Sequence, residues 1–269
     1  LGFFRVTHAG QFIALPWLPD NVPFASIGLS LLSVMLRCKS GVAMLKNDRR
    51  GKIHAQLVQA LKVELDHAEK VAYEYSSESH MQGSLSNRHE NFSGSDSLDP
   101  ERILTQSGCS NTMAREVFAL LGVYTSYKPG IHLISKAGMF EVLTEISFWP
   151  QKRYITRLVV THLDYSSSVE CREWLTSLMA NESIYTEIKV FSLGFLRAFA
   201  HSSYAEGDGS IVAWILECFM TAYSLHDDEV EELALSLVYE MCFYPNYLRM
   251  LVITYGLGPF VNEVQEKKY

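Results

Sequence analysis

Apolar residues recur at helical spacing along most of this sequence. Ile53, Leu57, Leu61 and Leu65 follow one another every four residues. Residues three or four apart lie on one face of an α-helix, so such a set predicts a helix with one buried stripe. No segment shows the alternation of a convincing strand. The sequence therefore predicts an all-α fold of about ten to thirteen helices, each of roughly 8 to 20 residues.

The pattern also repeats along the chain. Leu31–Val34 lead through a break to Gly41–Leu45, and Leu120–Val123 lead in the same way to Gly130–Ile134, 89 residues later. A looser third copy follows Met241 and runs through Pro245, Leu248, Leu251 and Gly256–Leu257. A recurring helical unit cannot bury its apolar stripe alone, so its copies stack. The repetition predicts an α-solenoid of armadillo/HEAT-like helical repeats, an architecture that usually binds other proteins.

Changes in composition divide the chain into four predicted parts. Residues 1–23 are an irregular N-terminal segment because three prolines interrupt any long helix. Residues 24–75 hold the first helical repeats, and residues 112–269 form the main armadillo/HEAT-like domain. Residues 76–111 are rich in serine and predict a flexible loop, because they bury too little apolar area to offset chain entropy. This loop is either a phosphorylated regulatory insert or a tolerated insertion.

Charge and length limit the classes of partner. The 269 residues are 48% hydrophobic and carry a net charge of −7, from 30 acidic and 23 basic residues. That composition supports a large core and lacks the basic stripe of a nucleic-acid binder. The short basic groups around Lys46–Lys52 and Lys152–Arg157 predict solvated helix faces. The longest uncharged run, Asn21–Leu36, is too short to span a bilayer.

Residue 1 is Leu, so we expect an internal piece of a longer chain. The five cysteines are an odd number without a CxxC pair, which predicts reduced, mostly buried thiols and an intracellular protein. The cysteines are Cys38, Cys109, Cys171, Cys218 and Cys242.

Motifs for catalysis are missing from the sequence, which has no GxSxG, P-loop, GxGxxG or HExxH pattern. We therefore predict no enzyme and no catalytic, cofactor-binding or metal residues. The acids after His226 are explained by a helix N-terminus, where the helix dipole favours negative charge. The run Gly207–Gly209 lacks the carboxylates of a calcium loop. We expect His162 to be buried and to bond the backbone, and Asp164 to form a turn. His132 and His201 are expected near helix ends.

Two helix starts and three tryptophans give local predictions. Ser167–Glu170 match a capping box, in which Ser167 caps the helix and Glu170 bonds the cap's own N–H. Asp227 is predicted to cap the helix that follows it. Trp149, Trp174 and Trp214 are predicted to lie in the core.

Several of these segments resemble one known family. Tyr127–Ile134 and Leu158–Ser166 are similar to the middle region of the Rictor, or Pianissimo, family. Further similar segments lie between residues 30 and 73 and between 112 and 245, among them Leu36–Val42, Trp174–Leu178, Lys189–Arg197 and Trp214–Cys242. The matching residues are packing patterns, and none is a catalytic signature. The serine-rich insert is longer than the family pattern, and residues 1–25 have no match.

The resemblance implies a non-enzymatic scaffold segment of TOR complex 2. Such a subunit would organise the TOR kinase and the other subunits and present AGC-family kinases for phosphorylation. It implies a cytoplasmic protein that associates peripherally with the plasma membrane through its complex, with no integral membrane segment and no nucleic-acid partner. The alternatives are another armadillo-type adaptor and an all-helical enzyme or lipid-binding domain with an enclosed pocket near His162, Asp164 and Cys171.

Overall fold

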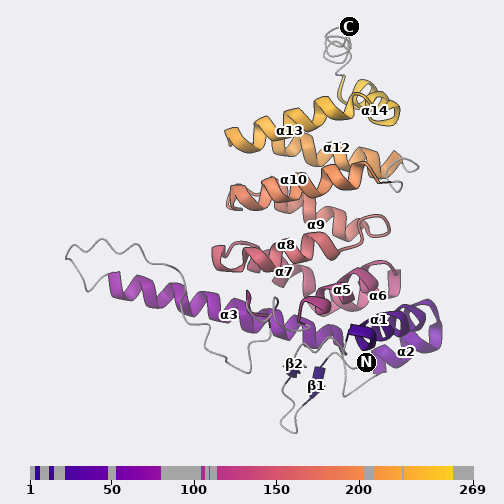
Figure 1. Cartoon of the computed structure of the whole chain (residues 1–269), viewed down its shortest axis with the longest axis vertical. Coiled ribbons are helices and arrows are strands. Elements are labelled where there is room, and N and C mark those ends of the chain that lie inside the picture. The colour runs from indigo at the N-terminus through magenta and orange to yellow at the C-terminus, as the bar shows by residue number, and fades with distance from the viewer. Residues whose placement is uncertain are drawn as a thin grey trace. The chain divides into compact units, whose positions relative to one another are not determined.

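The computed structural model is helical apart from one short hairpin (Figure 1). It describes residues 4–6, 12–14, 22–47, 53–79, 104–106, 109, 114–202, 209–225 and 227–256. Within these residues the chain forms two compact units, Leu1–His162 and Leu163–Tyr269. The all-α prediction is confirmed. A unit boundary follows His162, within the predicted main helical-repeat domain of residues 112–269. That boundary lies between one helix and the turn formed by Asp164.

The first unit holds both strands and eight helical segments among its described residues. Strands β1 (Phe4–Val6) and β2 (Phe12–Ala14) pair antiparallel, so the prediction of no strands is wrong for these six residues. The helical segments are α1 (Val22–Arg37), α2 (Lys39–Asn47), α3 (Ile53–Ser79), α5 (Ala114–Thr125), α6 (Lys128–Lys136), α7 (Met139–Ser147), the 3-10 helix η2 (Pro150–Lys152) and α8 (Arg153–His162).

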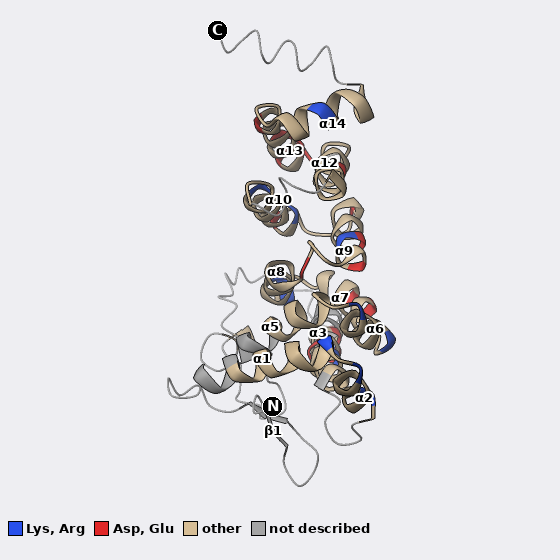
Figure 2. Ribbon diagram, turned by 90° about the vertical axis from the view of Figure 1, so that its right-hand side faces the viewer, with Lys and Arg blue, Asp and Glu red and all other residues tan. Residues whose placement is uncertain are grey.

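The helices of the first unit pack in two rows. Helix α5 lies between α1 and α8, while α3 packs on α6 and α7 (Figure 2). The predicted stripe of α3 is confirmed, because Leu57, Leu61 and Leu65 are buried. The helix continues to Ser79, so the predicted loop is wrong for residues 76–79. Leu104 and Cys109, near the other end of that loop, are buried, and residues 80–103 lie outside the described part.

The first two copies of the repeat have the same local geometry. A Cβ atom on Gly41 would collide with the backbone of Met35, and one on Gly130 with the backbone of Tyr124, six residues earlier in both cases. The bond from the Cys38 N–H to the Met35 carbonyl matches the bond from Tyr127 to Tyr124, each 3.4 Å long. The glycine is therefore required because the second helix turns back against the end of the first.

The third copy departs from this geometry. Gly256 does not open a second helix: it ends α14 (Pro245–Tyr255) in a left-handed conformation, with φ of 64°. Among the described residues beyond its own helix, no atom lies within 4 Å of a Cβ built on Gly256, so we assign it a role in ending the helix. The predicted third copy is therefore wrong at its glycine.

The second unit contains five described helices in two rows. Helices α9 (Val169–Ala180), α12 (Gly209–Tyr223) and α14 follow one another in one row, and α10 (Thr186–Ala200) and α13 (Asp228–Met241) form the other (Figure 2). The predicted core positions Trp174 and Trp214 are each 6% exposed. Trp214 stacks on the fully buried Tyr165, with 5.4 Å between the ring centroids. Trp149, in the first unit, is half-buried.

No single described helix is both long and apolar enough to cross a membrane. Helices α1 and α2 meet that test only when taken together, and they are bent by 110° at their junction.

Candidate functional site

The predicted polar residues have structural partners. His162 Nδ1 lies 2.7 Å from the carbonyl oxygen of Leu158, which confirms the bond to the backbone. The side chain is half-buried, so the prediction of a buried histidine is wrong. The Asp164 carboxylate accepts bonds from the N–H groups of Ser166, at 2.9 Å, and Ser167, at 3.1 Å, which confirms the predicted turn. His132 is exposed in the middle of α6, so the predicted position near a helix end is wrong for it, whereas His201 caps the end of α10 as predicted. His162 and Asp164 therefore have local roles in the backbone.

Metal-binding groups are also missing from the described part of the chain, where no cluster of three or more His, Cys, Asp or Glu side chains occurs. His226, Gly207 and Asp208 lie outside that part. Asp227 caps α13 by accepting a bond from the Val230 N–H at 3.3 Å, as predicted. The acids at this helix start therefore have an electrostatic role in the helix itself.

The helix cap before α9 differs from the prediction by one residue. Ser168, and not Ser167, is the cap, and its hydroxyl oxygen accepts a bond from the Cys171 N–H at 3.1 Å. The same hydroxyl donates to the Glu170 carboxylate at 3.3 Å. Glu170 therefore contacts the capping side chain, where a capping box would direct it to the backbone N–H.

A buried ion pair joins α3 to the 3-10 helix. The Lys152 ammonium lies 2.5 Å from the Glu64 carboxylate, and the two side chains are 4% and 1% exposed. The prediction that the basic group around Lys152 is solvated is wrong for this residue, whereas Arg157 is exposed as predicted. Periodicity missed the pair because the two residues are 88 positions apart and only packing brings them together.

A second buried lysine lies at the start of α10. Lys189 is 3% exposed, and burial lowers its pKa, although the negative charges of Asp227 and Glu182 oppose that change. The Thr186 hydroxyl donates to the Asp227 carboxylate at 2.5 Å. This bond lowers the pKa of Asp227, with further help from backbone N–H groups at the start of α13. Asp227 thus connects the starts of α10 and α13.

The thiols divide into one exposed and four buried groups. Cys109, Cys171, Cys218 and Cys242 are buried, and burial raises the pKa of Cys218 to about 12. Cys38 is exposed at the junction of α1 and α2. Its sulfur accepts bonds from the Ser40 hydroxyl and the Gly41 N–H, and these lower its pKa. All five thiols are free.

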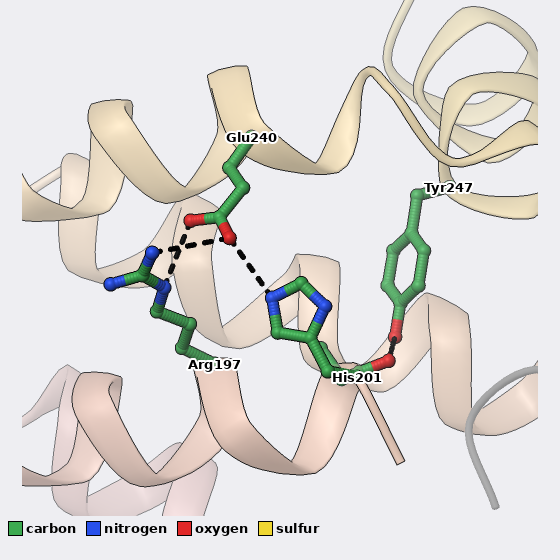
Figure 3. A network of polar contacts seen from close by, with 5 residues as sticks. Arg197, His201, Glu240 and Tyr247 are labelled. Carbon is green, nitrogen blue, oxygen red and sulfur yellow. Dashed lines mark hydrogen bonds and ion pairs between the residues drawn. The ribbon is translucent and has the colours of Figure 1, made fainter. Parts of the chain in front are cut away.

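A polar network faces solvent between α10 and α13 (Figure 3). Glu240 on α13 binds Arg197 Nε at 2.9 Å and His201 Nε2 at 2.9 Å, both from α10. Next to it, the Tyr247 hydroxyl donates to the Ala200 carbonyl at 3.4 Å. Exposed ion pairs of this kind add little stability, about 0–1 kcal/mol each, but they fix how two helices are paired.

Exposed aromatic and aliphatic side chains lie on α13 and in the turn that follows it. Leu235 is 43% exposed, and Tyr239 and Phe243 are each 40% exposed. The rings of Tyr239 and Phe243 meet edge to face, with 5.5 Å between their centroids. The sequence analysis did not single out these three residues, although their spacing of four residues is a pattern that the sequence contains. Such a surface suits protein contacts and offers nothing for covalent chemistry.

Comparisons with known proteins point to one family. The family described as "Rapamycin-insensitive companion of mTOR, middle domain" matches residues 95–200. Protein pianissimo A of Dictyostelium discoideum is 24% identical over 241 residues, which cover 90% of this chain and 19% of that protein. The human rapamycin-insensitive companion of mTOR is 24% identical over 88 residues, or 33% of this chain and 5% of that protein. The chain thus spans at most about a fifth of the relatives it matches.

Proposed function

The chain belongs to the Rictor and Pianissimo family, and from this premise we propose that it is a non-enzymatic scaffold segment of TOR complex 2. In that role it helps to organise the TOR kinase with its partner subunits and AGC-family kinase substrates. The observation that carries the proposal is the match to Pianissimo A along 90% of this chain. In this proposal the protein is cytoplasmic and associates with the plasma membrane through the complex.

The arrangement of helices supports a solenoid as the architecture of this scaffold. Each unit contains two rows of helices, and α1–α2 and α5–α6 share one backbone geometry. In the second unit, the caps of α10 and α13 are Tyr185 and Asp227, 42 residues apart. Armadillo and HEAT repeats have periods of about 40–47 residues. Stacked repeats of this kind give the long surface that a scaffold needs for large partners.

The roles of the polar residues support a non-enzymatic function. His162 bonds a backbone carbonyl, Asp164 holds a turn, and Cys171 is a buried thiol at the start of α9. Each of these residues was a candidate for an enclosed site, and each has a local structural role. Fold alone does not establish function, so the assignment to TOR complex 2 depends on family membership.

Affinity purification tests the proposal directly. A tagged protein carrying this chain is purified under mild conditions and probed for a TOR kinase and for AGC-family kinases. We expect TOR kinase to be recovered, with less recovery when the packing glycines Gly41 and Gly130 are both replaced by alanine. The matched control is Gly194→Ala, because a Cβ atom there meets nothing within 4 Å. Absence of TOR kinase from the wild-type sample would refute the proposal.

A further inference from the structure

Helices α10 and α13 are successive steps of one row, so their residues can be compared at an offset of 42. Residues on the inner side correspond closely. Four pairs are buried in both helices: Ile188 and Val230, Ser192 and Ala234, Leu196 and Val238, and Ala200 and Cys242. The two helices therefore present the same side to the neighbouring row.

The outer side of the two helices differs in one respect. Leu193 on α10 is fully buried, whereas Leu235, its equivalent on α13, is 43% exposed. Arg197 and His201 on α10 both bind Glu240 of α13. Their equivalents are Tyr239 on α13 and Phe243 in the turn just after it, and both are exposed. Helix α13 thus covers this side of α10, and the corresponding side of α13 carries an exposed stripe, Leu235–Tyr239–Phe243, which we call the α13 stripe.

The chemistry around the α13 stripe restricts what can cover it. Its three side chains are apolar or aromatic and lie four residues apart, which fits the apolar face of a second helix. Glu232 precedes Leu235 by three residues and so lies on the same side of α13, and it is exposed. Asp228, Glu229 and Glu231 add negative charge in the first turn. A helix that covers the stripe therefore needs an apolar face bordered by lysine or arginine.

The contact between α10 and α13 provides a template for such a complex. There Arg197 and His201 bind the Glu240 carboxylate of α13 (Figure 3). Leu193, on the same helix as Arg197, is buried. Tyr239 and Phe243 occupy the positions equivalent to Arg197 and His201. Aromatic rings attract cations to their faces. The carboxylates are now on α13, so the covering helix supplies the positive charge.

From these contacts we infer that the α13 stripe binds a basic amphipathic helix of a partner protein, which packs on α13 as α13 packs on α10. The inference rests on the proposed scaffold function and names the chemistry of one of its partners. Apolar contacts with the α13 stripe supply affinity, and the acidic side chains at the start of α13 select a positively charged partner.

A helical peptide tests this inference. The probe is a fluorescently labelled peptide of about 18 residues with leucine at i, i+3, i+4 and i+7 and lysine elsewhere, and anisotropy measures its binding to the whole chain. We expect the double substitution Tyr239→Ser with Phe243→Ser to weaken binding by about tenfold or more, because central aromatic side chains dominate such contacts. A matched peptide with glutamate in place of lysine should bind more weakly than the lysine peptide.

The control is Tyr223→Ser, which removes an aromatic side chain of equal exposure, 40%, from α12. It should leave peptide binding unchanged, and circular dichroism checks that all variants keep their helices. Equal binding by the double variant would overturn the inference, as would equal binding of both peptides. A dimer of the wild-type chain that the double substitution dissociates would also overturn it, because a second copy would then cover the stripe. TOR kinase recovery is scored separately, so failure of the peptide test leaves the scaffold proposal standing.

Discussion

Loss of the buried Glu64–Lys152 pair should destabilise the first unit strongly. The side chains are 1% and 4% exposed, and 2.5 Å separates the carboxylate oxygen from the ammonium nitrogen. At an effective dielectric constant near 20, that distance corresponds to an attraction of about 7 kcal/mol, which offsets a desolvation cost of several kcal/mol per ion. The pair as a whole therefore adds little to the free energy of unfolding, but removing one partner lowers that free energy strongly.

The substitution Lys152→Met keeps the length of the side chain and removes its charge. It leaves the Glu64 carboxylate buried without this cation, so we expect unfolding to become easier by about 3–5 kcal/mol. Glu64→Leu should cost less, because a lysine can extend its flexible chain to bring the ammonium to water. The double variant should lie within about 1 kcal/mol of wild type, because both charges are then absent.

Urea unfolding followed by far-UV circular dichroism measures these differences. With a slope of roughly 2–3 kcal/mol per molar, the midpoint for Lys152→Met should fall by about 1–2 M. Hydrogen exchange should show that backbone amides lose protection in α3 and around the 3-10 helix. The control is Lys136→Met, which removes an exposed lysine of α6. The reasoning is refuted if Lys152→Met lies within about 1 kcal/mol of wild type, or if the double variant is no more stable than Lys152→Met.

Three further perturbations test other features of the structure. Gly130→Ala should destabilise the chain because its Cβ collides with the Tyr124 backbone, whereas Gly194→Ala should stabilise it by about 0.5–1 kcal/mol. A higher thermal unfolding midpoint for Gly130→Ala than for Gly194→Ala contradicts this packing. Asp227→Asn should leave a stability deficit at neutral pH. Because folding lowers the pKa of Asp227, the deficit should shrink as pH falls through its usual value near 3.8; a pH-independent deficit in urea titrations argues against the charge. Cys38 should react first with iodoacetamide, and labelling of Cys38→Ser at the wild-type rate refutes this.

Helical spacing predicted most of the inner faces correctly because burial and periodicity have the same cause. The stripe of α8 shows this, since Ile155 and Val159 are fully buried. The stripe of α10 was less accurate. Phe191, Phe195 and Phe199 recur there at helical spacing, which favours burial on one face, yet they are only half-buried. The large rings lie at the edge of the contact, while smaller side chains such as Ser192 fit between the two rows.

Helix ends were predicted less well than helix interiors. The apolar pattern of α3 stops near Ala72, yet the helix continues to Ser79. A formed helix extends at little cost per residue, and serine is only mildly unfavourable in it, so the absence of an apolar stripe does not end a helix. The predicted cap of α9 was wrong by one residue because the adjacent Ser167 and Ser168 can both accept a bond from an N–H group of the first turn.

The sequence by itself determined the helical class, the inner faces and the tight glycine junctions, because these depend on contacts between residues close along the chain. The ion pair of Glu64 with Lys152, the exposed stripe on α13 and the boundary after His162 were decided only by tertiary structure. Each of these depends on which helices become neighbours and which side of a helix stays uncovered. A local pattern of apolar and polar residues carries no record of that arrangement, because it gives the same helix whether or not another helix packs on its outer side.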